Sequence, residues 1–249
     1  TTHHEYLHEV GGVTGVGALL RTFTGRILDF QPDAWTTHVA GHPPGALLVF
    51  VGLDRLGLSG GAWAATVCVL IGALVAVAVP ETLRLLGDEK AARAALPFLV
   101  LFPGAIWTGA SADGLFAGLT ATGVALLARG LTRPAPAAAA TGGALLASGA
   151  YLSYGLVLLA PVMVAVVVVA RPVRCGRLGW VLLGGVAVAG AFTAGGFWWP
   201  DGYHLSVERY YQGIAGDRPY AYWVWANVAA LAACAGPAAA VILRRAAVQ

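Results

Sequence analysis

After residue 43 the sequence consists largely of long runs of Ala, Val, Leu and Gly, separated by short charged segments. Only 11% of the residues are charged, whereas a soluble domain carries about 25%. Backbone polar groups inside a bilayer need internal partners, so these runs predict membrane-spanning helices. The expected fold is all-α: a polytopic transmembrane helix bundle with an extracytoplasmic, interfacial amphipathic helix.

The chain divides into two expected parts. Residues 1–43 form an extracytoplasmic polar segment, and residues 44–249 form a transmembrane bundle of about seven to eight membrane helices. These helices are predicted at 44–58, 62–80, 93–109, 113–129, 137–152, 154–170, 178–198 and 221–243. The segments 44–58 and 137–152 are shorter than the roughly 20 residues of a full span, so we expect tilted or re-entrant helices there.

Within the polar part, residues 13–30 carry apolar side chains at helical spacing, with charged side chains largely between them. This pattern predicts an amphipathic helix in the membrane interface. Gln31-Pro32-Asp33 should end it, because proline disfavours helix at the preceding residue.

Basic residues give a partial topology. Arginines gather at 84–93, 129–133, 171–177 and 244–245, and such clusters are typical of cytoplasmic helix ends. Segments 109–113 and 198–220 then face outside. If 44–58 crosses fully, residues 1–43 lie inside; if it does not, they lie outside, and both alternatives stay open here. The net charge of +3 is small and scattered, so no nucleic-acid partner is expected.

The first candidate site is His3-His4-Glu5-Tyr6-Leu7-His8-Glu9. Glu5 and Glu9 are four residues apart, as are His4 and His8, so one helical face could bind a divalent ion or supply a general base. The alternative is a solvated chain start or a tag remnant. Since no Met or signal peptide begins the chain, we expect it to be part of a longer protein.

Two further candidates begin membrane helices. His38 and His42, the latter followed by Pro43-Pro44, could ligate a metal or contact a phosphate, although no third ligand is identifiable. The alternative is a helix cap, because proline favours a first helical turn. Ser111 is a plausible N-cap, and Asp113 would be favoured by the helix dipole. The alternative for Asp113 is a role lining a polar cavity.

The segment 198–220 is expected to be an outer loop rich in Trp, Tyr and charged residues. Trp and Tyr are typical of membrane interfaces. Arginine also binds phosphate bidentately, and aromatic faces can stack on sugar rings. The candidate substrate-binding residues of this segment are His204, Arg209, Tyr210, Arg218 and Tyr220.

The order of these features resembles the GT-C superfamily of polytopic glycosyltransferases, of the mannosyltransferase and arabinosyltransferase kind. The resemblance covers most of the chain through short motifs. These are the interfacial helix, His42-Pro43-Pro44-Gly45, Ser111-Ala112-Asp113, the short Gly-rich helices at 137–170, and Arg218-Pro219-Tyr220.

The resemblance implies a multi-pass plasma-membrane enzyme with an extracytoplasmic active face. It would move a sugar from a polyprenyl-phosphate donor to a glycan, lipid or protein acceptor. The family places its catalytic carboxylate after a first transmembrane helix, and none precedes Thr1, so Glu5 and Glu9 stand in as catalytic candidates. Arg209 or Arg218 would contact the phosphate, and a divalent cation such as Mg or Mn is the one cofactor considered.

Two other functions fit the composition. A transporter or flippase would carry ionisable residues inside its spans or paired broken helices in an internal repeat. The spans here contain few charges, and no repeat is evident. The other alternative is a non-catalytic membrane subunit that binds a partner or lipid.

Overall fold

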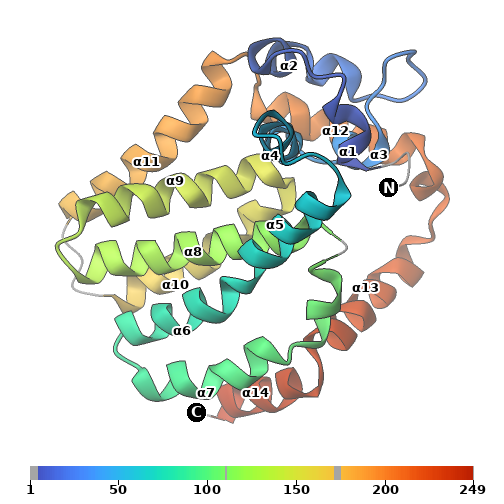
Figure 1. The fold of residues 1–249 in the computed structure, drawn as a ribbon. Helices are drawn as coiled ribbons and strands as arrows, with labels where there is room; N and C mark the ends of the chain where they lie inside the picture. The colour runs from blue at the N-terminus through green and yellow to red at the C-terminus, as the bar shows by residue number, and fades with distance from the viewer. Residues whose placement is uncertain (1–4, 110, 171–174, 249) are drawn as a thin grey trace.

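In the computed structural model, which describes residues 5–109, 111–170 and 175–248, every regular element is a helix (Figure 1). The α-helices are α1 (Tyr6–Val10), α2 (Val16–Thr22), α3 (Thr37–Ala40), α4 (Pro44–Arg55), α5 (Gly61–Ala73), α6 (Val75–Leu85), α7 (Glu89–Val100), α8 (Asp113–Thr132), α9 (Pro136–Leu152), α10 (Ala160–Val169), α11 (Cys175–Ala194), α12 (Trp199–Gln212), α13 (Tyr220–Ala235) and α14 (Pro237–Val248). The 3₁₀ helices are η1 (Thr24–Arg26), η2 (Pro103–Trp107), η3 (Tyr154–Leu159) and η4 (Ile214–Asp217).

Three helices of the described chain are long and apolar enough to cross a membrane: Gly61–Leu85, Asp113–Thr132 and Gly176–Ala194. They coincide with the predicted segments 62–80, 113–129 and 178–198. A fourth candidate is the pair α13 and α14, which bends by 93° at a break. Gly236 occupies that break with φ 74°, a conformation open to glycine but strained for other residues.

The other predicted membrane segments are shorter or interrupted helices. Segment 93–109 falls partly in α7 and partly in η2, which begins at Pro103, a residue whose missing N–H suits the start of a new helix. Segment 154–170 begins as the 3₁₀ helix η3 before α10 continues it. Segments 44–58 and 137–152 form α4 and α9, of 12 and 17 residues.

Contacts of glycines in α5, α8 and α9 show the relative directions of these helices. Gly72 approaches Gly114, near the start of α8, while Leu85 packs with Leu127 near its end, so α5–α6 and α8 run in the same direction. The chain must therefore return between them, and α7 with η2 makes this return (Figure 1). By the same argument α9 is antiparallel to α8, because Gly130 meets Ala139.

The bundle thus has two ends, named here for α8: the Asp113 end and the Thr132 end. Among described residues, the Thr132 end carries six basic and three acidic side chains: Arg84, Lys90, Arg93, Arg129, Arg133 and Arg177, against Glu81, Asp88 and Glu89. The Asp113 end, with α1–α4 and α12, carries five basic and nine acidic side chains: Arg21, Arg26, Arg55, Arg209 and Arg218, against Glu5, Glu9, Asp29, Asp33, Asp54, Asp113, Asp201, Glu208 and Asp217. The predicted cluster members Arg171 and Arg174 lie outside the described residues, and the predicted pair Arg244 and Arg245 lies on α14 and is counted with neither end.

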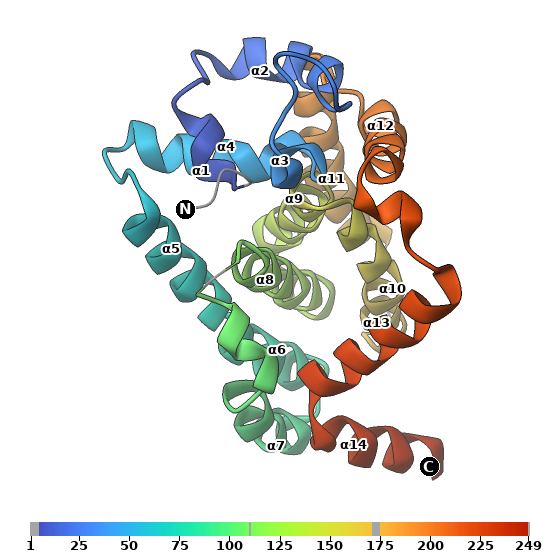
Figure 2. The ribbon, with the colours of Figure 1, turned by 90° about the vertical axis from the view of Figure 1, so that its right-hand side faces the viewer.

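The position of α4 shows whether segment 44–58 crosses the helix bundle. Near its start, Gly45 lies against Tyr151 at the end of α9; farther along, Phe50 stacks on Tyr6 of α1. Both ends of α4 therefore lie at the Asp113 end, beside α1 and α5 (Figure 2). Segment 44–58 does not cross the bundle, so residues 5–43 share an end with Asp113.

Two sequence predictions at this end are wrong. Residues 13–30 do not form one amphipathic helix: α2 ends at Thr22, η1 ends at Arg26, and Phe30 has φ 67°. The chain turns back because the Trp35 N–H donates to the Arg26 carbonyl over 2.8 Å, a contact that periodicity does not encode. Segment 198–220 is mostly the helix α12 rather than a loop, with Pro200 in its first turn.

Candidate functional site

A cleft of about 330 Å³ opens at the Asp113 end between α1, α4, α5 and the segment that leads into α8. Its floor is apolar, and its polar side chains come from residues far apart in the sequence. The cleft is lined by Glu5, Tyr6, Leu7, Phe50, Gly61, Ala64, Ala65, Cys68, Gly109, Ser111 and Ala112. A mostly apolar lining with a few polar side chains is typical of small-molecule binding sites.

Tyr6 lines the cleft and has only 6% of its surface exposed. Its ring stacks on Phe50 at 5.3 Å and meets the edges of His38 and His42 at 6.3 and 5.8 Å between ring centroids. Burial raises the pKa of the Tyr6 phenol above its ordinary value, and the charges of Asp113 and Glu5 raise it further. Tyr6 is therefore a neutral hydroxyl at physiological pH.

His42 is half-buried and held in one tautomer. Its Nδ1 lies 2.8 Å from the His38 carbonyl oxygen, which can only accept, so Nδ1 carries the proton. Burial lowers the pKa of His42 below its ordinary value, while that hydrogen bond and the charge of Asp113 oppose the shift. In the neutral ring Nε2 is then the lone-pair nitrogen, able to accept a hydrogen bond or a proton.

His38 and His42 do not lie on one helix. Helix α3 ends at Ala40, one residue before Gly41, and Pro43 is extended at the start of α4. Both imidazole rings nevertheless lie against Tyr6, because a turn and a helix that begins with proline separate them.

Two carboxylates belong to this site. Glu5 lies just before α1, and its Oε1 is 3.9 Å from His38 Nε2. Asp113 is the first residue of α8, and its charge acts on both Tyr6 and His42. Ser111 Oγ donates to Asp113 Oδ2 over 2.5 Å and accepts the Asp113 N–H at 3.1 Å. The cap position itself is occupied by Ala112, so Ser111 orients Asp113 rather than capping α8 directly.

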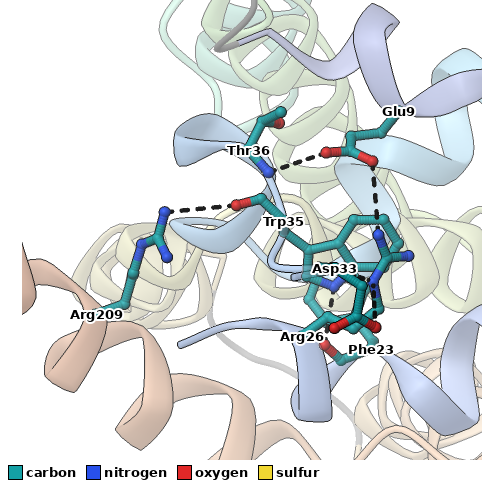
Figure 3. Close-up of polar contacts among 7 residues, drawn as sticks. All are labelled: Glu9, Phe23, Arg26, Asp33, Trp35, Thr36 and Arg209. Carbon is teal, nitrogen blue, oxygen red and sulfur yellow. Dashed lines mark hydrogen bonds and ion pairs between the residues drawn. The ribbon is translucent and has the colours of Figure 1, made fainter. Parts of the chain in front are cut away.

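Glu9 belongs to a second group of polar contacts, the Trp35 cluster, drawn in Figure 3. Its members are Glu9, Phe23, Arg26, Asp33, Trp35, Thr36 and Arg209. Glu9 Oε1 accepts the Thr36 N–H at 3.0 Å, and its Oε2 lies 3.8 Å from Arg26 Nη2. Glu5 and Glu9 therefore contact different partners and do not share one helical face as a carboxylate pair. His4 lies outside the described residues.

Arg209 reaches the same cluster from α12. Its Nη2 donates to the Trp35 carbonyl at 3.5 Å, and its Nη1 lies 2.9 Å from Asp29 Oδ1. The Arg209 side chain is only 13% exposed. In addition, Gln212 Oε1 accepts the Asp29 N–H at 2.7 Å. Arg209 thus fixes α12 to the N-terminal segment.

The remaining candidates lie on α12, on α13 and in the short segment that precedes α13. His204, Tyr210 and Tyr220 are exposed, and the Arg218 guanidinium carbon lies 4.6 Å from the centre of the Trp223 ring. The start of α13 and helix α1 lie on opposite sides of the molecule in Figure 2. The structure therefore gathers Glu5, His38, His42 and Asp113 around Tyr6, and it places Arg218 and Tyr220 away from that group.

Residues 5–109, 111–170 and 175–248 contain no group of three or more His, Cys, Asp or Glu side chains positioned to hold a metal ion. The sequence analysis also missed the two residues that organise the site, Tyr6 and Trp35. Tyr6 stands between Glu5 and Leu7 within the charged N-terminal run. A large aromatic residue within a polar segment was the one sign in the sequence that other parts of the chain pack over this segment.

Comparison with known proteins yields no match: no protein-family model, no curated protein and no solved structure is similar to this chain. The site's geometry is therefore the basis for assigning a function.

Proposed function

We propose that this protein is an integral membrane glycosyltransferase that takes a sugar from a polyprenyl-phosphate donor. The observation that supports it most is the cleft beside the apolar helix α5, which is lined by Glu5, Tyr6 and Ser111, while His38 and His42 pack against Tyr6. Carboxylates, imidazoles and an aromatic ring are the groups that recognise sugar hydroxyls and faces. The adjacent apolar helix would receive the lipid part of the donor.

The charge of the two ends supports an extracytoplasmic position for this cleft. Cytoplasmic segments of membrane proteins carry an excess of Lys and Arg. The Thr132 end has that excess, whereas the Asp113 end is acidic. In the proposed orientation the Thr132 end faces the cytoplasm, and the cleft opens outside the plasma membrane, where polyprenyl-phosphate sugars and envelope acceptors meet.

In the proposed reaction Glu5 accepts the proton of the acceptor hydroxyl, whose oxygen attacks C1 of the sugar. The bond between C1 and the phosphate oxygen breaks, and the lipid phosphate leaves with its electron pair. Glu5 suits this role better than Glu9, because Glu9 is occupied by Arg26 and the Thr36 N–H. The neutral Tyr6 hydroxyl and His42 ring would hydrogen-bond the sugar, and Asp113 would position it.

The basic side chains have separate proposed roles. Arg209 already contacts Asp29 and the Trp35 carbonyl, so its proposed role is to hold α12 against the N-terminal segment rather than to bind phosphate. Arg218 precedes α13, away from Tyr6 (Figure 2), so it would not reach a phosphate bonded to a sugar in the cleft; with His204, Tyr210 and Tyr220 it is a proposed surface contact for an extended acceptor.

The test is sugar transfer in lipid. The purified protein is supplied with radiolabelled polyprenyl-phosphate sugars and an acceptor extract, beside Glu5→Gln and Glu208→Gln. Glu208 is an exposed carboxylate on α12, so its variant controls for the loss of one charge. We expect transfer by the wild type and Glu208→Gln, and at least a hundredfold loss in Glu5→Gln. A folded wild type that transfers no sugar would reject the proposal in favour of a transporter or binding subunit.

A further inference from the structure

A second cavity lies at the opposite end of the bundle from the cleft. It has a volume of about 280 Å³ and is formed where α8 ends and α9 and α11 begin. Its lining residues are Gly130, Pro134, Ala135, Pro136, Ala139, Gly176, Arg177 and Trp180. None of them belongs to the cleft, so the proposed transferase chemistry leaves this cavity without a role.

The lining of this cavity combines an apolar wall with one fixed cation. The wall is made of Ala, Gly and Pro, closed on one side by Trp180, whose side chain is 47% exposed. Arg177 donates from Nη1 to the Leu131 carbonyl, which anchors the guanidinium at the end of α8. A guanidinium has five N–H donors, so one such bond leaves it able to bind an oxyanion.

The surroundings of the cavity are positively charged. Arg133 directly precedes the lining residue Pro134, and Arg129 precedes Gly130; both arginine side chains are exposed. Two acidic residues at this end lie at the start of α7, and both already have partners. Glu89 forms an ion pair with Arg93, and the Asp88 carboxylate accepts the Ala91 N–H. A ligand that complements this cavity would therefore place an anionic group near the arginines and an apolar chain against the Ala, Gly, Pro and Trp residues.

We propose that this cavity binds an anionic phospholipid of the cytoplasmic leaflet. Arg177 and Arg133 would contact the headgroup phosphate, and one acyl chain would lie along Trp180 and the Pro136–Ala139 turn. Basic pockets between helices on the cytoplasmic side bind such headgroups, and Trp favours the membrane interface. The inference rests on the membrane orientation proposed above and not on glycosyl transfer.

Two glycines of α11 give a matched pair of variants. Gly176 lines the cavity, whereas Gly179 does not, and a Cβ added at either position meets no atom of the described residues within 4 Å. Gly176→Leu therefore fills the cavity without displacing backbone, and Gly179→Leu controls for the same substitution on the same helix. Wild type and variants are reconstituted in bilayer nanodiscs of equimolar phosphatidylglycerol and phosphatidylcholine, and native mass spectrometry measures the lipid each retains.

We expect the wild type to retain phosphatidylglycerol in preference to phosphatidylcholine, and Gly176→Leu to lose that lipid while Gly179→Leu keeps it. Arg177→Gln should lower phosphatidylglycerol occupancy about fivefold, which corresponds to about 1 kcal/mol. Arg93→Gln removes an ion-paired arginine at the same end and should change nothing. Equal retention of both lipids by the wild type, or full retention by Gly176→Leu, would overturn the proposal. Because sugar transfer is not the readout, its failure would be a separate result.

Discussion

The guanidinium carbon of Arg26 lies 3.4 Å from the centre of the Trp35 ring, stacked over its face. The same Arg26 donates from Nε to the Asp33 carbonyl at 2.6 Å, while the Trp35 Nε1 donates to the Phe23 carbonyl at 2.9 Å. This pair closes the loop that follows η1 and fixes the start of α3 (Figure 3). Since α3 carries His38, the cation–π contact helps to position His38 beside Tyr6.

Trp35 should therefore be a main contributor to the stability of the N-terminal segment. Trp35→Phe keeps an aromatic ring but leaves the Phe23 carbonyl without its donor, which should cost about 1–3 kcal/mol. Thermal unfolding in detergent should show this as a drop of roughly 2–4 °C for each kcal/mol. Trp225→Phe is the control, because Trp225 is 73% exposed. Equal unfolding temperatures for the two variants would show that the Trp35 contacts contribute little.

Substitutions of Arg209 and Arg218 should have different effects, because Arg209 stabilises the fold whereas Arg218 is a proposed substrate contact. Arg209→Ala removes the tie to Asp29 and the Trp35 carbonyl, and we expect a loss of about 1–3 kcal/mol, because the arginine is largely buried while Asp29 is partly solvated. Arg218→Ala should leave the unfolding temperature and the use of the polyprenyl-phosphate donor unchanged but weaken the use of an extended acceptor. If Arg218→Ala uses the acceptor as the wild type does, Arg218 is not an acceptor contact.

The shifted histidine gives a pH dependence of stability. Burial lowers the folded-state pKa of His42 below its ordinary value of 6.5, so the unfolded chain takes up a proton first as pH falls. The contribution of neutral His42 is fully present above pH 6.5 and is lost below it. The slope should be at most about 1.4 kcal/mol per pH unit.

Unfolding temperatures of the wild type and His42→Gln, measured from pH 5 to pH 8, test this expectation. The difference between the two proteins should vary with pH only in the acid part of the range. His38, Glu5 and Asp113 lie near Tyr6 and His42 in both proteins, so the comparison removes their contributions. A difference that is constant across the whole range would show that His42 does not have a lowered pKa.

Close helix packing depends on single glycines. A Cβ at Gly118 would overlap the Ile71 carbonyl oxygen, so α5 and α8 are in contact through backbone. Gly118→Ala should destabilise the bundle by about 1–3 kcal/mol through forced separation of the helices. Gly190→Ala, where nothing lies within 4 Å of the added carbon, should be neutral or stabilising by up to about 1 kcal/mol. The comparison of their unfolding temperatures checks this, and a tolerant Gly118 would mean that α5 can shift freely.

Much of the helical content follows from the sequence, because apolar runs and their charged boundaries are local signals. The segment 113–129 predicted α8 almost to its ends, and Arg129 and Arg177 predicted the basic end of the bundle. Helix breaks were predicted less well. The 93° bend between α13 and α14 and the division at Pro103 lie inside apolar stretches that hydropathy alone treats as continuous.

The candidate site was recovered only in part. Glu5, His38, His42 and Asp113 were singled out from separate motifs, but nothing local indicated that Tyr6 joins them. Arg209 was expected at a phosphate, whereas its partner Asp29 is 180 positions earlier in the chain. Contacts of such separation depend on how α12 packs, which no short-range pattern specifies.

The sequence by itself determined that this chain is helical, that several of its helices are apolar enough for a membrane, and that its charges are unevenly placed. These properties follow from composition and periodicity, which act over a few turns of helix. Only the tertiary structure decided that α4 stays at the Asp113 end, that Glu5 and Glu9 contact different partners, and that Tyr6 is buried beside two histidines. Those outcomes depend on which helical faces meet, and that choice is made by packing between residues remote in the sequence.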